Sequence, residues 1–274
     1  MNVLELFNLR CGVTSGDLGV EIEVEGNNLP NAAGKYWRVE RDGSLVGESN
    51  EYVFRAPLSD PDMCKAIDCL SAVFADKGSE VYDTVRCGVH VHVNVQELER
   101  NELFNFITLY TMFEWVLLDY CGKGRKGNLF ALPINRSPLL VDKLCSVLVK
   151  KDYKSLYNDE YRYCAINVKA LGEYGSLEFR AMRGGDFNKV KSWASFLLHL
   201  RTMAKGFNNP CDIIQCSSMM GLEEFFKHIA GEHYNLFKCY DNKQRKLVDG
   251  VRNVLPIVYA IDWEKVEIPY EDFC

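Results

Sequence analysis

Three short segments of the chain alternate polar with apolar residues, and their polar positions hold glutamate, histidine, asparagine and arginine: 21–25, 88–95 and 177–181. Successive side chains of a strand point to opposite faces, so residues two apart lie together at about 6–7 Å. Each segment therefore predicts a strand with one apolar face and one face of potential ligands. The ligand positions are Glu21, Glu23, Glu25, His90, His92, Asn94, Glu178 and Arg180. Such side chains on three sheet faces indicate a site for divalent metal and phosphate rather than a solvated surface.

The carboxylates of the first segment suit Mg²⁺ or Mn²⁺, which prefer oxygen ligands. Glu21 and Glu23 are the candidates, although glutamate is also common on solvated strand faces. Glu25 is expected to face solvent or a neighbouring loop. Glu51, on a later strand, is a third candidate ligand, and Glu48 is its substitute.

The most specific element is the run Gly88-x-His90-x-His92-x-Asn94. A glycine lets backbone or ligand approach closely. An imidazole such as that of His90 binds a metal or a phosphate, and the competing interpretation is a buried, hydrogen-bonded histidine. Further nitrogen or sulfur ligands for zinc are not evident, so a carboxylate-rich Mg²⁺ or Mn²⁺ site is favoured.

Arginine side chains are expected to hold phosphate or carboxylate oxygens. Arg162 and Arg180 are the candidates, and the alternative for Arg180 is a surface ion pair with Glu178. The basic, glycine-rich segment Gly122–Gly127 is not a phosphate-binding P-loop, because no Gly-Lys-Ser/Thr follows. An ordinary flexible loop is favoured there over a lid that covers phosphate.

The order of elements predicts an α+β fold in a single catalytic domain over 1–274, with a core at about 18–205 and a helical or irregular extension at 206–274. Helices on one side would cover an antiparallel sheet. The expected strands are 19–25, 36–40, 51–56, the segment around His90, and a hairpin of 163–170 with 175–182. The expected helices are 60–77, about 97–121, 137–150 and about 186–205. Residues 41–45 predict a tight Asp-Gly turn.

Bulk properties narrow the class of protein. The net charge of −6 argues against non-specific binding to nucleic acid. The apolar stretch 103–121 is interrupted by polar residues and predicts a buried helix, not a membrane span. The first residues lack the pattern of a secretion signal, and the 11 cysteines form no Cys-x-x-Cys pair. Reduced thiols and a cytoplasmic location are therefore expected.

The motifs gain meaning from their order along the chain. They run Glu-x-Glu at 21–23, a glutamate strand that ends in Ala-Pro-Leu at 56–58, Gly-x-His-x-His-x-Asn at 88–94, Arg-Tyr-x-x-x-Asn at 162–167 and Glu-x-Arg at 178–180. This order resembles the glutamine synthetase and glutamate–cysteine ligase superfamily of carboxylate–amine ligases. It resembles more closely the amidoligase family, a compact branch of that superfamily, over residues 18 to 190.

The resemblance implies a curved antiparallel sheet that forms a funnel, with helices on its outer face. ATP would enter at one end, the carboxylate and amine substrates at the other, and Mg²⁺ or Mn²⁺ would lie between. The implied metal ligands are Glu21, Glu23, Glu51, His90 and Glu178. The implied contacts to the nucleotide are His90, His92, Asn94, Arg162 and Arg180, and the two arginines are the catalytic residues.

The implied activity is ATP-dependent formation of an amide bond through an acyl phosphate, from small-molecule or peptide substrates. No nucleic acid or membrane partner is expected. Two alternatives stay open: a metal-dependent hydrolase or phosphotransferase on the same sheet, and a binding module that kept the fold without activity.

Overall fold

The computed structural model describes residues 1–9, 13–82, 84–122, 124–157, 161–238 and 241–264. They form an open antiparallel sheet of seven strands with α-helices, which confirms the α+β class. The strands are β1 (Leu18–Asn27), β2 (Trp37–Glu40), β3 (Ser49–Phe54), β4 (Glu80–Val81), β5 (Gly88–Asn94), β6 (Ile166–Asn167) and β7 (Ser176–Arg183). Their order is β2-β3-β1-β5-β7-β6, and β4 pairs with the far end of β1.

Among the described residues, one helix precedes the first strand, four lie between strands, and the other four follow the last strand. They are α1 (Val3–Phe7), α2 (Asp60–Lys77), α3 (Arg100–Cys121), α4 (Pro138–Lys150), α5 (Ala170–Tyr174), α6 (Phe187–Ala204), α7 (Pro210–Met220), α8 (Leu222–Ala230) and α9 (Lys243–Val258). Short 3₁₀ turns lie at Arg125–Gly127, Ile134–Arg136, Tyr153–Tyr157 and Gly231–Phe237.

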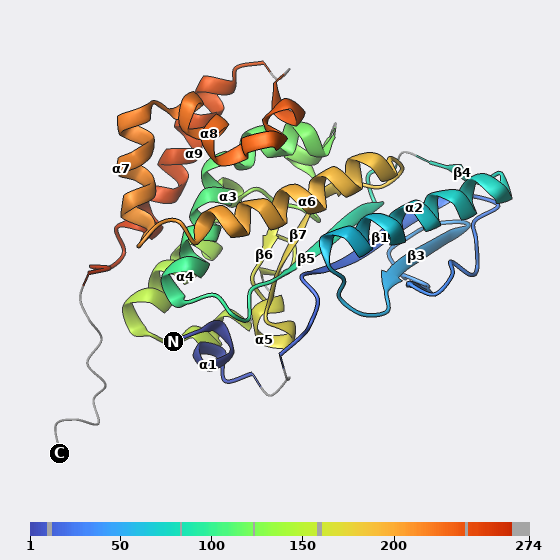
Figure 1. Ribbon diagram of the computed structural model, residues 1–274, viewed down its shortest axis with the longest axis horizontal. Helices are drawn as coiled ribbons and strands as arrows, with labels where there is room; N and C mark the ends of the chain where they lie inside the picture. The colour runs from blue at the N-terminus through green and yellow to red at the C-terminus, as the bar shows by residue number, and fades with distance from the viewer. Residues whose placement is uncertain (10–12, 83, 123, 158–160, 239–240, 265–274) are drawn as a thin grey trace.

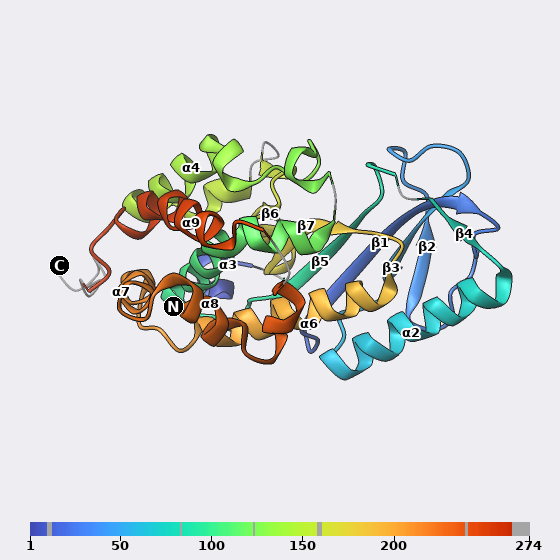
Figure 2. The ribbon, with the colours of Figure 1, turned by 90° about the horizontal axis from the view of Figure 1, so that it is seen from above.

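One face of the sheet is apolar and carries helices. Ile22, Val91 and Phe179 on the three central strands are fully buried on this face. Helices α2 and α6 pack against each other along it, and Figures 1 and 2 show them side by side across the strands. The alternation of residues fixes this arrangement, because every second side chain of β1, β5 and β7 must leave water together. The opposite face is left for the polar positions of the same strands.

Helix α3 is buried on almost all sides and joins the C-terminal helices to the sheet. It packs on α6, α7, α9 and β7. At the crossing with α9, a Cβ built on Gly250 would lie 1.9 Å from the carbonyl oxygen of Met112, so only glycine permits this approach. Side chains from 206–264, including Phe225 and Ile257, belong to the same hydrophobic core as the sheet. Across the described ranges, no helix is both long and apolar enough to cross a membrane.

Two segments differ from their expected local structure. The predicted hairpin of 163–170 with 175–182 contains only a short β6, because α5 forms between the strands and ends at Gly175 with φ +65°. The predicted turn of 41–45 is present, since the Leu45 N–H donates to the Asp42 carbonyl at 3.4 Å, but it lies within a longer connection of 41–48 between β2 and β3. Its own side chains set its shape, since Asp42 accepts a hydrogen bond from the Ser44 N–H and Glu48 accepts one from the Leu29 N–H.

Candidate metal centre and its two cavities

The register of the sheet brings the predicted ligands into neighbouring positions on one face. Directly opposite residues of an antiparallel pair point to the same side. The pairs that matter are Glu21 with His90, Glu23 with Glu51, His92 with Glu178, and Asn167 with Glu178. The four strands β3, β1, β5 and β7 therefore contribute to one polar cluster, together with Asn167 of β6.

A β-bulge lies at the centre of this cluster. Val89 pairs with Met182 and Val91 pairs with Phe179, so His90 alone stands opposite two residues of β7, Arg180 and Ala181. An extra residue bends the strand and redirects its side chains, and bulges of this kind are common beside functional sites.

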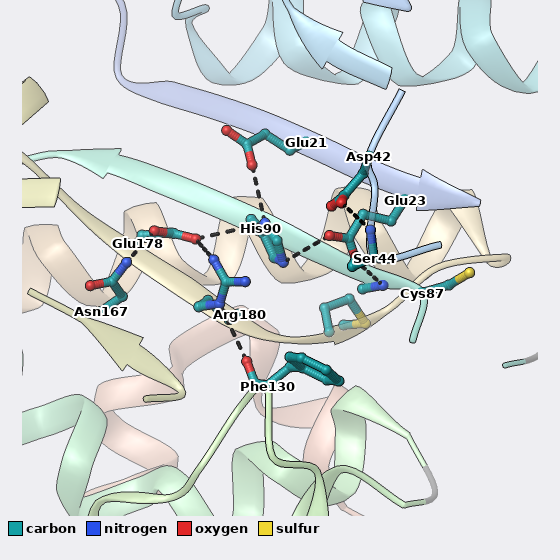
Figure 3. A network of polar contacts seen from close by, with 12 residues as sticks. Glu21, Glu23, Asp42, Ser44, Cys87, His90, Phe130, Asn167, Glu178 and Arg180 are labelled. Carbon is teal, nitrogen blue, oxygen red and sulfur yellow. Dashed lines mark hydrogen bonds and ion pairs between the residues drawn. The ribbon is translucent and has the colours of Figure 1, made fainter. Parts of the chain in front are cut away.

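The imidazole of His90 joins the two sides of the cluster (Figure 3). Its Nδ1 lies 3.0 Å from Glu21 Oε2 and 3.7 Å from Glu178 Oε1, and its Nε2 lies 3.7 Å from Glu23 Oε1. Two groups of potential metal ligands result: Glu21, His90 and Glu178, and Glu23, Glu51 and His90. Within each group the ligand atoms lie within 4.8 Å of one another, close enough to bind one ion.

Neighbouring donors hold the carboxylates in place. The Gly88 N–H donates to Glu23 Oε2 at 2.8 Å, and Asn167 Nδ2 donates to Glu178 Oε2 at 2.5 Å. Glu178 also forms an ion pair with Arg180, whose Nε donates to the carbonyl of Phe130 at 3.3 Å. The ion pair that the sequence offered as an alternative thus exists, but both of its side chains are mostly buried.

The cluster carries more negative charge than its own residues compensate. Burial, then the charges of Glu21 and Glu23, raise the pKa of Glu51 to about 7. Burial raises the pKa of Glu23, against the opposing charge of His90. Burial also opposes ionisation of Glu21, but hydrogen bonds with His90 and His92 outweigh it and hold the pKa of Glu21 well below its usual range. Crowded carboxylates beside an imidazole fit a hard divalent cation such as Mg²⁺ or Mn²⁺.

Two cavities meet at this cluster. One, of about 310 Å³, is called the arginine cavity because four of its side chains are guanidinium groups. It is lined by Glu23, Asp42, Ser44, Arg86, Gly88, His90, Arg125, Phe130, Arg162, Tyr163 and Arg180. Its aromatic residues Phe130 and Tyr163 are in contact, and their ring centroids lie 5.8 Å apart. The guanidinium carbon of Arg162 lies 4.5 Å from the centroid of the Tyr163 ring.

The other cavity, of about 320 Å³, is called the mixed cavity because acidic and basic side chains both line it. Its lining is Thr14, Asp17, Gly19, Val20, Glu21, Arg38, Val53, Phe54, Arg55, Ala56, Pro57, His92, Asn94, Glu173, Tyr174 and Ser176. Glu21 belongs to this cavity, while its partner His90 belongs to the arginine cavity. The Glu21–His90 pair therefore forms the boundary between the two.

The structure divides the predicted nucleotide contacts between these cavities. His90, Arg162 and Arg180 line the arginine cavity, whereas His92 and Asn94 line the mixed cavity. His92 Nδ1 is 3.1 Å from Ser176 Oγ, and Asn94 donates to the backbone carbonyls of the 14–16 segment.

The remaining glutamates of the predicted set lie apart from the cluster. Glu25 does not face solvent, because it is buried against a loop, accepts the Val46 N–H and forms two hydrogen bonds with Arg86 at 2.8 and 3.1 Å. Glu48 binds the backbone of Leu29 and does not replace Glu51.

Sequence reasoning missed Arg125. The residue lies in the segment expected to be an ordinary flexible loop, yet its side chain is buried and its Nη2 donates to the carbonyls of Cys87 at 2.9 Å and Met182 at 2.8 Å. This bond pattern ties the 3₁₀ turn Arg125–Gly127 to the ends of β5 and β7. The sequence signal that could have identified Arg125 was the run of basic residues between the glycines of Gly122–Gly127. Such a run is as typical of a phosphate-binding loop as of a solvated one.

Compared with models of known protein families and with curated proteins, the chain matches none. The cluster, its two cavities and the order of the motifs therefore carry the functional argument.

Proposed function

We propose that this protein is an ATP-dependent carboxylate–amine ligase of the amidoligase type, which forms an amide bond through an acyl phosphate. The observation that carries the proposal is the pair of cavities that meet at the Glu21–His90 boundary. One offers four guanidinium groups and a pair of contacting aromatic rings beside Glu23 and Asp42, the other offers exposed side chains of both charges, and the carboxylate cluster lies between. A reaction that consumes one nucleotide and joins two further substrates needs a separate place for the nucleotide and for the substrates. The open antiparallel sheet, with helices on one face and the cluster on the other, supports a funnel of the glutamine synthetase kind.

The arginine cavity is assigned to ATP. Guanidinium groups suit phosphate oxygens, and the Phe130–Tyr163 pair with Arg162 offers a surface on which a base can stack. His90 and Arg180 would then lie at the phosphate end of the nucleotide, since both belong to or contact the carboxylate cluster.

The carboxylate cluster is assigned to Mg²⁺ or Mn²⁺. Glu21, His90 and Glu178 would hold one ion, and Glu23 and Glu51 with His90 a second. Bound there, the cations would neutralise charge on the phosphate oxygens. The pKa values of Glu51 and Glu23 are raised by burial, and that of Glu51 also by the charges of Glu21 and Glu23. This supports the assignment, because a bound cation would favour the ionised forms.

The mixed cavity is assigned to the carboxylate and amine substrates. Arg38 and Arg55 lie on its β2–β3 side and suit a carboxylate, whereas the exposed Glu173 suits an ammonium group. The amine must lose a proton before it attacks, so acidic groups near it both attract the cation and accept that proton.

The reaction has two balanced steps. A carboxylate oxygen attacks the γ-phosphorus of ATP, a new P–O bond forms, and the bond to the β–γ bridging oxygen breaks with its electron pair leaving on ADP. The amine nitrogen then attacks the acyl carbon, the C–O bond breaks, and phosphate leaves with the proton released by the amine. The arginines stabilise the charge on the transferred group, and the cavities hold the reacting atoms together. No protein nucleophile is required.

The test is phosphate release from ATP and Mg²⁺ in the presence of pools of amino acids, peptides and polyamines, with product masses measured. We expect release that depends on a pool, and a product lighter by one water than its two parts. Phosphate release without any amine, with no new product, would support the hydrolase alternative and overturn the ligase proposal. Nucleotide binding without turnover on any pool, including denatured and native protein acceptors, would support the binding module instead.

A further inference from the structure

The guanidinium groups of the arginine cavity differ in whether an acid already neutralises them. Arg86 is paired in two hydrogen bonds with Glu25, and Arg180 is paired with Glu178. Arg162 is exposed to water, which screens its charge. Each of these three cations is thus stable without a ligand.

Arg125 is the exception. Arg125 is only 3% exposed. Among the described residues, no carboxylate lies within ion-pair distance of its guanidinium group. Its Nη2 uses both protons on the carbonyls of Cys87 and Met182, while its buried Nε has no partner. Burial lowers the pKa of Arg125 to about 10, as expected for a cation that has lost water without gaining an acid.

A buried charge without a counter-charge is costly, and proteins keep one where a ligand supplies the missing partner. Two carbonyl dipoles replace part of the lost hydration, but they leave the net positive charge in place. The nearest acid of the cluster, Glu23, attracts Arg125 but is not bonded to it. The missing partner is therefore an anion that enters the arginine cavity.

The position of Arg125 identifies which part of a nucleotide it meets. A Cβ built on Gly88 would lie 3.2 Å from Arg125 Nη2, 3.2 Å from Glu23 Oε2 and 3.4 Å from His90 Nε2. The guanidinium, Glu23 and His90 thus surround one glycine in the lining of the arginine cavity. An anion held there lies beside the carboxylate cluster.

We propose that Arg125 binds the phosphoryl group that is transferred, as the γ-phosphate of ATP and then as the phosphate of the acyl phosphate. The identity of this anion rests on the proposed function. In the first step the phosphorus exchanges its bond to the ADP oxygen for a bond to the carboxylate oxygen, and in the second step the acyl C–O bond breaks, so that this oxygen leaves with the phosphate. The three non-bridging oxygens keep their charge through both steps. Arg180, already neutralised by Glu178, positions that carboxylate and the Phe130 loop. The sequence analysis had expected Arg162 and Arg180 to hold the transferred phosphate or the substrate carboxylate.

The proposal separates ATP from ADP, which lacks the γ-phosphate. Calorimetric titration of the full chain with ATP and with ADP, each with Mg²⁺, should show that Arg125→Gln weakens ATP binding about ten- to hundredfold. The same variant should weaken ADP binding less than about threefold. Arg125→Lys retains a charge without the planar fork and should fall between wild type and Arg125→Gln. The matched control is Arg201→Gln, which removes a mostly buried guanidinium that pairs with Asp17, donates to the Asn94 carbonyl of β5 and lies outside both cavities.

The ratio of the affinity for ATP to the affinity for ADP distinguishes phosphate binding by Arg125 from a merely structural role. If Arg125 only anchors its loop to β5 and β7, ATP and ADP binding weaken by the same factor, and the proposal is overturned while the ligase function stands. The same holds if Arg201→Gln changes the ATP-to-ADP ratio as much as Arg125→Gln does. Should Arg125→Gln fail to fold, the Arg125→Lys ratio decides alone.

A wild-type chain that binds neither nucleotide would overturn the proposed function instead. In that event, the thermal unfolding midpoint with and without inorganic tripolyphosphate tests whether Arg125 binds an anion. A rise in the midpoint for wild type but not for Arg125→Lys or Arg125→Gln supports an anion site on this residue. No rise for wild type overturns it.

Discussion

The two cavities have nearly the same volume, about 310 and 320 Å³, but their walls are built in opposite ways. In the arginine cavity, hydrogen bonds to Glu25, to backbone carbonyls and to Glu178 hold Arg86, Arg125 and Arg180 in place, and both glutamates are buried. In the mixed cavity, the charged side chains Arg38, Arg55 and Glu173 are exposed. The first wall keeps its shape before a ligand arrives, and the second can rearrange around one.

This difference has a physical consequence for recognition. Fixed donors aimed at one position stabilise one pattern of charge and need no reordering when the ligand binds. Exposed, long side chains lose conformational freedom on binding and tolerate ligands of several shapes. The arginine cavity therefore suits a ligand that is the same in every cycle, and the mixed cavity suits substrates that set the specificity of a particular enzyme.

The largest expected effect comes from the shared boundary. His90→Ala and Glu178→Ala each remove a candidate metal ligand that both cavities depend on, so turnover should fall at least about 100-fold with every substrate pool. Both variants should still unfold cooperatively, because neither side chain lies in the apolar core. Glu178→Ala also lowers the thermal midpoint, since it leaves Arg180 and Asn167 without their carboxylate partner. Glu48→Gln is the control: it keeps an acceptor for the Leu29 N–H and lies outside both cavities, so full activity is expected. Full activity in both alanine variants would contradict the assignment of the site.

A smaller effect, on the free energy of unfolding, is expected from Glu114, which supports a loop of the arginine cavity and no part of the mixed cavity. Glu114 of α3 is fully buried and accepts the Ile134 N–H at 2.8 Å, which anchors the loop that carries Phe130. Burial raises the pKa of Glu114 to about 8, and its neighbours Tyr110 and Cys164 also have pKa values raised by burial. A folded-state pKa above the unfolded value means that the native state binds the extra proton. Wild type should therefore lose stability as pH rises from about 4.5 to 8.

Glu114→Gln keeps the acceptor but does not titrate, so it isolates this contribution. The unfolding free energy of the variant minus that of wild type should rise by about 1 kcal/mol for each pH unit between pH 5 and 8. Urea unfolding at pH 5, 6.5 and 8 measures it. A difference that is constant with pH would mean that Glu114 is ionised in the native protein, and the wall of the arginine cavity would then rest on a buried charge.

The sequence was informative where local rules decide the structure. The alternation of residues placed Glu21, His90 and Glu178 on one sheet face, because the period of a strand leaves no other choice. Helices α2 and α6 begin and end near the predicted residues, since Pro61, Gly78 and Asp186 are strong boundary signals. The polar cluster and the α+β class were predictable for this reason.

The parts that could not be predicted depend on contacts between distant residues. Arg125 is buried only because the carbonyls of Cys87 and Met182, 38 and 57 residues away, converge on it. Glu25 is buried by Arg86, which lies 61 residues later. Alternation also assigned His92 and Asn94 to the correct face, but it does not tell which end of β5 lies beside which cavity.

The smallest expected effects test the division between the cavities most directly. Gly88 and Gly19 occupy the floors of the arginine cavity and the mixed cavity, and an alanine at either position adds one methyl group at a close contact. At Gly88 the new Cβ would lie 3.2 Å from Glu23 and Arg125, and at Gly19 it would lie 3.3 Å from His92 Cβ. Overpacking of about 1 kcal/mol corresponds to about a fivefold loss of affinity.

We expect Gly88→Ala to raise KM for ATP with little change in KM for the carboxylate and the amine, and Gly19→Ala to do the reverse. Steady-state kinetics with each substrate varied in turn measures both. If both variants raise the same KM, the two cavities are one binding site for one ligand, and the division of labour between a fixed wall and an adaptable wall is wrong.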